Sequence, residues 1–140
     1  MAISTDDELR DILRTAKTIA VVGLSADPEK PSHEVAAYLQ AQGYRIVPVN
    51  PRGGTILGEK VYPDLLAVPE PVDLVDVFRP AAACEEVAQQ AIAARAKVLW
   101  LQLGIVNDTA AQQARAAGLR VVMDRCTLRE HRRLGLARPG

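Results

Sequence analysis

The chain has 140 residues, of which 49% are hydrophobic and 24% charged, and its 17 basic residues balance 17 acidic ones. A chain of this length can bury about two thirds of its unfolded surface, which is enough for a core without disulfides or metals. The neutral balance excludes a global field that would attract nucleic acid or a membrane, so any anion site must be local.

The sequence shows no targeting or membrane segment. Residues 1–13 are acidic and amphipathic, without the apolar core of a signal peptide, and no stretch approaches the roughly 18 apolar residues that span a bilayer. Cys84 and Cys126 are not spaced like zinc or redox motifs, which favours a reducing compartment. We expect one cytoplasmic domain over residues 1–140, with a core at about 8–130, a basic tail at 131–140 and no metal site.

The first predicted elements are a helix and a buried strand. Residues 5–16 form an apolar face at helical spacing, and Thr5 with Glu8 has the spacing of a capping box. The face consists of Leu9, Ile12, Leu13 and Ala16. Residues 18–23 are almost entirely apolar, which is typical of a parallel strand covered on both faces.

A second helix and strand follow. Apolar spacing predicts a helix that starts at Ser32 and stops at Gly43. Residues 45–50 are the second predicted strand, and Pro48 within it indicates an edge or irregular position. The segment after this strand is rich in turn residues, and we predict no strand there.

The rest of the chain alternates between strand and helix. We predict strands at 73–78, 97–102 and 120–124. We predict helices at 80–92, with Pro80 in the first position, at 107–117 and, as a short closing helix, at 127–134. This alternation indicates right-handed crossovers, and hence an α/β fold with about five parallel strands and helices on both faces, in three layers.

In such a sheet, the ligand crevice lies beyond the carboxyl ends of the strands, where the strand order reverses. Four loops should meet there: 23–32, 50–54, 78–80 and 102–107. We therefore look for function in these loops.

The loop after Gly23 resembles a glycine-rich nucleotide loop but lacks its later glycines. Eight residues separate Gly23 from Ser32, whereas a dinucleotide fingerprint starts its helix at once. This longer arch can offer an anion the amides of Leu24 and Ser25, the Ser25 hydroxyl and the Lys30 ammonium. The alternative is an ordinary surface loop.

The end of the second strand argues against NAD. Dinucleotide sites usually place an acid there for the ribose hydroxyls, whereas this chain has Asn50, followed by Pro51 and Arg52. A ribose that carries a phosphate would suit Arg52 better than a bare diol.

Six motifs follow one another within about residues 8–130: VVGLS, KPSHEVAAYLQAQGY, VPVNP, GEKVYPDL, VDVF and LWLQLG. In this order they resemble the small CoA-binding domain proteins, relatives of the CoA-binding domain in the succinyl-CoA ligase α subunit. The resemblance implies a Rossmann-like, doubly wound domain that binds coenzyme A at the strand ends.

The resemblance also implies where the ligand would lie. The nucleotide would cover the turn that begins at Gly23, the cations would hold phosphates, and the other loops would shape the groove. The candidate cofactor-binding residues are Gly23, Leu24, Ser25, Lys30, Ser32, Asn50, Pro51, Arg52, Phe78, Arg79, Pro80, Gln102 and Gly104.

The charge of the ligand agrees with this implication. Coenzyme A carries roughly four negative charges, so a neutral protein must gather cations and amides locally to hold it. Lys30, Arg52 and Arg79 all fall on the predicted ligand edge. For each of them, the alternative is a solvated surface cation.

Catalytic chemistry is not indicated. The ligase relatives carry a further domain with a phosphorylated histidine, for which this chain has no room, and neither His33 nor His131 can replace it. Cys84, in the first turn of a predicted helix, could form a mixed disulfide with the CoA thiol, but packing is favoured for it and for Cys126.

The remaining polar and aromatic candidates are given structural roles. Asp73 and Asp76 are expected to cap or face a helix, and Trp100 and Tyr38 to lie in the core. The arginines near the C-terminus are expected to form a solvated end rather than an RNA site. They are Arg129, Arg132, Arg133 and Arg138.

We therefore expect a cytoplasmic protein that binds coenzyme A or acyl-CoA and has no catalytic activity of its own. We expect neither nucleic acid nor a membrane as a partner, and a protein partner is left open. The alternatives are an NAD(P)-binding oxidoreductase, a component of an acyl-CoA ligase that needs a partner, and an interaction module with a vestigial groove.

Overall fold

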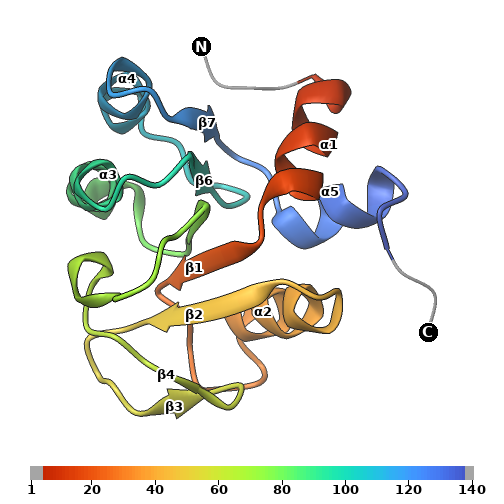
Figure 1. The fold of residues 1–140 in the computed structure, drawn as a ribbon, viewed down its shortest axis with the longest axis vertical. Helices are drawn as coiled ribbons and strands as arrows, with labels where there is room; N and C mark the ends of the chain where they lie inside the picture. The colour runs from red at the N-terminus through yellow and green to blue at the C-terminus, as the bar shows by residue number, and fades with distance from the viewer. Residues whose placement is uncertain (1–4, 138–140) are drawn as a thin grey trace.

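The computed structural model describes residues 5–137, and its centre is a parallel sheet of five strands in the order β2-β1-β5-β6-β7 (Figure 1). The strands are β1 (Thr18–Val22), β2 (Arg45–Val49), β5 (Leu74–Val77), β6 (Val98–Leu101) and β7 (Arg120–Val122). This confirms the predicted α/β fold, and each strand lies within the range predicted for it.

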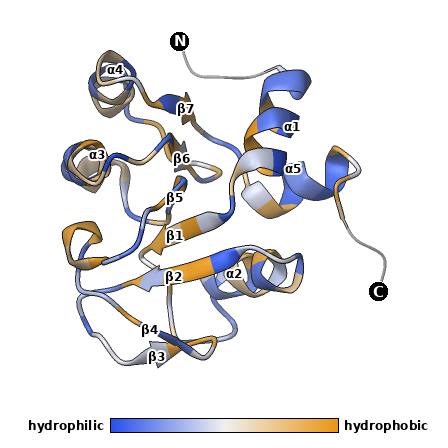
Figure 2. Ribbon diagram, in the orientation of Figure 1, coloured by the Kyte–Doolittle hydropathy of each residue, from blue (hydrophilic) through white to orange (hydrophobic). Residues whose placement is uncertain are grey.

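Helices cover both faces of the sheet and make three layers. One face carries α1 (Asp6–Thr15), α2 (Pro31–Ala41) and α5 (Thr127–Arg133). The other carries α3 (Cys84–Ala93), α4 (Asp108–Ala116) and the 3-10 helix η1 (Leu65–Ala67), while a second 3-10 turn, η2 (Ala81–Ala83), leads into α3. In Figure 2 the middle parts of β1 and β2 are hydrophobic, whereas α1 is largely hydrophilic on the side that is seen.

Alternate strand residues enter the two cores. In β1, Ile19 and Val21 pack with α1, α2 and α5, whereas Ala20 and Val22 pack with α3 and α4. All four are at most 8% exposed, as expected for a strand buried on both faces. Pro48 lies in β2, one of the two edge strands of this sheet. This confirms the edge position that was predicted because proline lacks an amide donor.

The N-terminal helix also agrees with the sequence. Thr5 is the N-cap of α1, where its hydroxyl accepts from the Glu8 amide at 3.3 Å and donates to the Glu8 carboxylate at 2.6 Å. The predicted apolar face is buried. It consists of Leu9, Ile12, Leu13 and Ala16.

One strand pair was not predicted. A short antiparallel hairpin joins β3 (Thr55–Ile56) to β4 (Glu59–Lys60) beside β2. Its turn places Leu57 at φ 54° and Gly58 at φ 76°, a left-handed pair in which leucine is unusual. The Gln40 amide donates to the Leu57 carbonyl at 3.0 Å, so α2 holds this turn in place.

Two predicted helix starts were wrong. The helix α2 begins at Pro31 with Lys30 as its N-cap, one residue before the predicted start at Ser32, because proline fits the first helical position. Pro80 caps η2, and α3 begins only at Cys84.

The basic tail predicted from residue 131 begins later in the structure, because α5 extends to Arg133. His131 is 4% exposed and bonded to the Tyr38 hydroxyl at 2.8 Å. Arg133 pairs with Glu130 and Asp6. Residues 131–133 therefore belong to the packed fold, and Arg138 lies outside the described residues. Among the helices within residues 5–137, none is both long and apolar enough to cross a bilayer.

The strand order reverses between β1 and β5, where two backbone segments meet closely. Gly23 has a φ of 87°, and a Cβ at this position would lie 2.7 Å from the Phe78 carbonyl oxygen. The Gly23 amide donates to the Val49 carbonyl, and the Phe78 amide donates to the Val22 carbonyl. Only glycine fits here, and the loops after three strands are thereby brought together.

We predict that Gly23→Ala lowers the free energy of unfolding by more than about 2 kcal/mol, because backbone strain adds to a contact with a backbone oxygen that cannot move away. Gly118→Ala is the matched control, since Gly118 has a φ of 95° and nothing within 4 Å of an added Cβ. It should lose only about 1 kcal/mol. Urea denaturation measures both values, and equal losses would show that the approach to Phe78 is unimportant.

Candidate functional site

A cavity of about 720 Å³ opens at the carboxyl ends of β1, β2 and β5. Its volume lies in the range of small-molecule sites, and its place at the strand reversal is where α/β sheets bind ligands. We call it the cationic cavity. It is lined by Gly23, Ser25, Ala26, Asp27, Lys30, Asn50, Pro51, Arg52, Gly53, Ile56, Phe78, Arg79 and Pro80.

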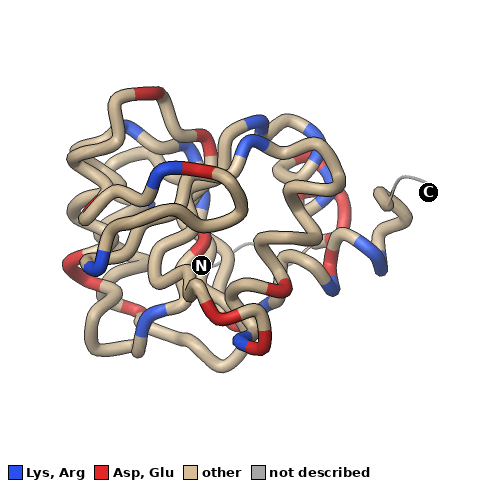
Figure 3. The backbone as a smooth tube through the Cα atoms, turned by 90° about the horizontal axis from the view of Figure 1, so that it is seen from below, with Lys and Arg blue, Asp and Glu red and all other residues tan. Residues whose placement is uncertain are grey.

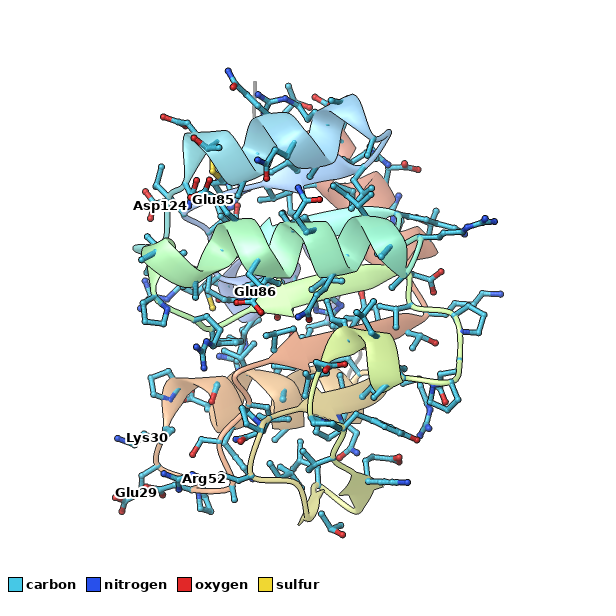
Figure 4. The ribbon with its side chains drawn as sticks, turned by 90° about the vertical axis from the view of Figure 1, so that its left-hand side faces the viewer. Glu29, Lys30, Arg52, Glu85, Glu86 and Asp124 are labelled. Carbon is cyan, nitrogen blue, oxygen red and sulfur yellow. The ribbon has the colours of Figure 1, made fainter. Side chains whose placement is uncertain are left out.

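Three cations from three different loops give this cavity its charge. Lys30, Arg52 and Arg79 are exposed, and none of them forms an ion pair with any residue in the described range 5–137. The acidic residue of the lining is Asp27. Figure 4 shows Lys30 and Arg52 at the same corner of the molecule, with Glu29 beside them. The cavity therefore has a local excess of positive charge.

This excess is local and does not reflect the whole surface. Basic and acidic residues are interspersed along the tube in Figure 3. Other arginines are held by carboxylates, as Arg45 is by Glu59 and Glu70. Cations elsewhere in residues 5–137, such as Arg14 and Arg129, also lack an ion pair, so the cavity is distinguished by three such cations around one space.

Asn50 ties two of the loops together. Its side-chain amide donates to the Leu24 carbonyl at 2.9 Å, and its side-chain oxygen accepts from the Arg52 amide at 2.9 Å. Both polar atoms of Asn50 are thus engaged within the protein. Its function is to fix the position of the Arg52 loop relative to the Gly23 loop.

The loop after Gly23 differs in part from the expectation. The Ser25 amide was expected to face an anion, but it donates to the Ser32 hydroxyl at 3.0 Å. The side chains of Leu24 and Ser32 are buried and do not line the cavity. The Ser25 hydroxyl accepts from the Asp27 amide at 3.0 Å and donates to no residue within 5–137.

A second cavity, of about 380 Å³, lies next to the first, and Phe78 lines both. Gln102 lines this second cavity and is separate from the cationic one. Gly104 lines neither cavity, and its amide donates to Asp124 at 2.6 Å. The second cavity is lined by Pro31, Val35, Phe78, Gln102, Leu103, Ile105, Cys126 and Arg129.

A buried carboxyl group is bonded to Gln102 of the second cavity, and this contact was not predicted from the sequence. Asp76 is fully buried in β5, where it accepts from the Gln102 amide at 2.5 Å and from the Thr127 hydroxyl at 2.9 Å. Burial raises the pKa of Asp76 to about 7, although its two hydrogen bonds oppose the shift. The group joins β5 to Gln102, which follows β6, and to Thr127 of α5; of the two expected roles, it faces a helix and does not cap one.

The other polar candidates are structural. Asp73 does not cap a helix either; it accepts from the amides of Lys17 and Thr18, where α1 meets β1. Burial raises the pKa of the Cys84 thiol, with an opposing effect of Arg79, so the packing role favoured for Cys84 fits. His33 lines neither cavity. Within residues 5–137, no group of three or more His, Cys, Asp or Glu side chains is placed to hold a metal ion.

With this geometry in view, comparison with known proteins identifies the family. Residues 17–132 match the family model of the CoA binding domain. The chain belongs to this CoA-binding domain family. The uncharacterized protein YneT of Bacillus subtilis is 41% identical over 119 residues, which cover 85% of this chain and 88% of YneT.

Two further relatives extend the comparison. A solved structure from Thermus thermophilus has 46% identity and a TM-score of 0.89, covering 94% of this chain and 99% of that one. An ADP-forming acetate–CoA ligase of Archaeoglobus fulgidus is 36% identical over 85 residues, or 59% of this chain. Those residues are 12% of the ligase, so the likeness covers only a small part of that enzyme.

The buried Asp76 should make stability depend on pH. Its folded pKa of about 7 exceeds the ordinary value of 3.8, so the fold stabilises the protonated form. This contribution is complete below about pH 4 and is lost as the pH rises towards 7, with a slope of up to ~1.4 kcal/mol per pH unit.

Asp76→Asn removes the titrating proton, so the free-energy difference between wild type and variant should shrink from pH 4.5 to pH 7. Urea denaturation at several pH values measures it. Parallel profiles for the two proteins would mean that Asp76 is already ionised at low pH.

Proposed function

We propose that this protein binds coenzyme A, free or acylated, with its phosphates in the cationic cavity. The observation that carries the proposal is the meeting of Lys30, Arg52 and Arg79 around one cavity in a chain whose net charge is zero. No ion pair within residues 5–137 involves any of these three cations, so all three are available to a ligand. Coenzyme A, with roughly four negative charges, needs such a set of charge-assisted contacts.

The end of β2 favours this ligand over NAD. An NAD site uses an acidic side chain there to accept from the ribose hydroxyls. Here Asn50 occupies the position, and its side-chain nitrogen and oxygen are bonded to the Leu24 carbonyl and the Arg52 amide. Arg52 follows two residues later and would instead bind a phosphate on the ribose.

Binding alone accounts for the arrangement. We propose that the protein carries, senses or buffers coenzyme A or acyl-CoA in the cytoplasm, where the free thiols of Cys84 and Cys126 would persist. The Archaeoglobus relative is named as an acetate–CoA ligase. Any ligase chemistry of this chain would need a partner protein, since the candidate site consists of binding groups.

Calorimetry should find micromolar binding of coenzyme A and weaker binding of dephospho-CoA, which lacks the 3′-phosphate. The loss should be about 10-fold or more, the effect of one charge-assisted phosphate contact. Selective binding of NAD would overturn the proposal in favour of an oxidoreductase, and no binding of any of the three would favour a vestigial groove.

Replacing a cavity cation should weaken the same binding. Arg52→Ala or Lys30→Ala is expected to cost about 1.5–3 kcal/mol, or about 10- to 100-fold in Kd. Arg14→Ala is the control with the same charge change, because Arg14 is an exposed cation in the last turn of α1 and lines neither cavity. Equal affinities of the Arg52 and Arg14 variants would remove Arg52 from the site.

A further inference from the structure

The second cavity contains a free thiol that the proposed function does not use. Cys126 is half-buried, immediately precedes α5 and lines this cavity together with apolar side chains such as Val35 and Ile105. Leu103, at its edge, is 53% exposed, which is unusual for a large apolar residue in this chain. The cavity therefore combines a thiol with apolar surface that is open to a ligand.

Gln102 supplies an independent sign that this cavity takes a ligand. The residue is only 4% exposed, and its side-chain nitrogen donates to Asp76 at 2.5 Å and to Thr127 at 2.8 Å. Its side-chain oxygen accepts no hydrogen bond from any of the residues described. Because the nitrogen is turned to the buried network, the oxygen is the amide atom that remains for the cavity.

The two cavities adjoin at two points of their linings. Phe78 lines both, and the consecutive residues Lys30 and Pro31 line the cationic and the second cavity respectively. A ligand with phosphates in the first cavity can thus extend an arm into the second. The arm of coenzyme A carries amide N–H donors, which match the Gln102 oxygen, and ends in a thiol.

We propose that Cys126 exchanges disulfides with this thiol arm, so that the protein holds coenzyme A covalently when the cofactor is oxidised. This rests on the proposed function. The Cys126 thiolate attacks one sulfur of CoA disulfide, forming the bond between Cys126 and one CoA and breaking the bond between the two CoA sulfurs. The second CoA leaves as a thiolate and takes up the proton that the Cys126 thiol lost. CoA disulfide is the oxidant, so the step is balanced.

Arg129 is a further feature of the second cavity that favours disulfide exchange at Cys126. It lines the same cavity, is exposed and forms no ion pair within residues 5–137. A cation at this place stabilises the negative charge that moves between the sulfurs. Cys84 has no such access, because it is 0% exposed and packs in the opposite core.

The test is intact-protein mass spectrometry of the reduced full chain after incubation with CoA disulfide, with glutathione disulfide as the comparison reagent. We expect one CoA adduct per chain, located at Cys126 by peptide mapping, and formation at least about tenfold faster than the glutathione adduct because the phosphates hold the reagent in place. Arg52→Ala should reduce this ratio towards one.

Cysteine variants show which of the two thiols forms the CoA adduct. Cys126→Ser and Cys126→Ala should form no CoA adduct, whereas Cys84→Ala, the matched control, should react like wild type. Thermal melting checks that each variant is folded. Two replacements are made at position 126 so that the conclusion does not depend on a single variant that fails to fold.

The outcomes distinguish this proposal from the proposed function. Binding of reduced coenzyme A by wild type without any adduct, an adduct on Cys84, or equal rates with both disulfides would overturn the role of Cys126 and leave the binding function intact. Failure to bind reduced coenzyme A would overturn the binding function itself.

Discussion

The site depends on the close approach of two backbone segments at the point where the strand order reverses. Gly23 lies so near the Phe78 carbonyl that no side chain fits between them. The loops after β1 and β5 are therefore forced together, and the bond from the Gly23 amide to Val49 brings in the end of β2. Lys30, Arg52 and Arg79 come from these three loops, so their meeting is a consequence of backbone packing. A fold without this contact would scatter the same charges over the surface.

Two kinds of polar contact then adapt the crevice to a long, charged ligand. Asn50 fixes the loop of Arg52 against the loop of Gly23, which restricts where the cations can lie before a ligand arrives. On the other side of Phe78, the buried Asp76 holds the Gln102 nitrogen and the Thr127 hydroxyl. This network orients the Gln102 amide and attaches α5, which follows Cys126, to the sheet. The cationic and second cavities are thus supported by separate hydrogen-bond systems.

The strands and the site loops could be predicted from sequence because apolar runs and glycine positions are local signals. The hairpin of β3 and β4 could not, since its strands are very short and its turn places Leu57 in a left-handed conformation that its sequence does not indicate. The internal contacts of Ser32 and Gln102 could not be predicted either. The Ser32 hydroxyl accepts from the Ser25 amide and the Gln102 nitrogen donates to Asp76, and both contacts depend on tertiary packing.

The central claim is that the anionic ligand binds at the carboxyl edge of the sheet, and an NMR titration of amide ¹H–¹⁵N signals with reduced coenzyme A tests it most directly. The account predicts that the largest shifts occur in residues 23–30 and 50–54 and at Phe78 and Arg79. It also predicts small changes at the opposite edge, where Lys17 and Arg45 lie. Shifts concentrated at that opposite edge, or spread evenly over surface cations, would contradict the account.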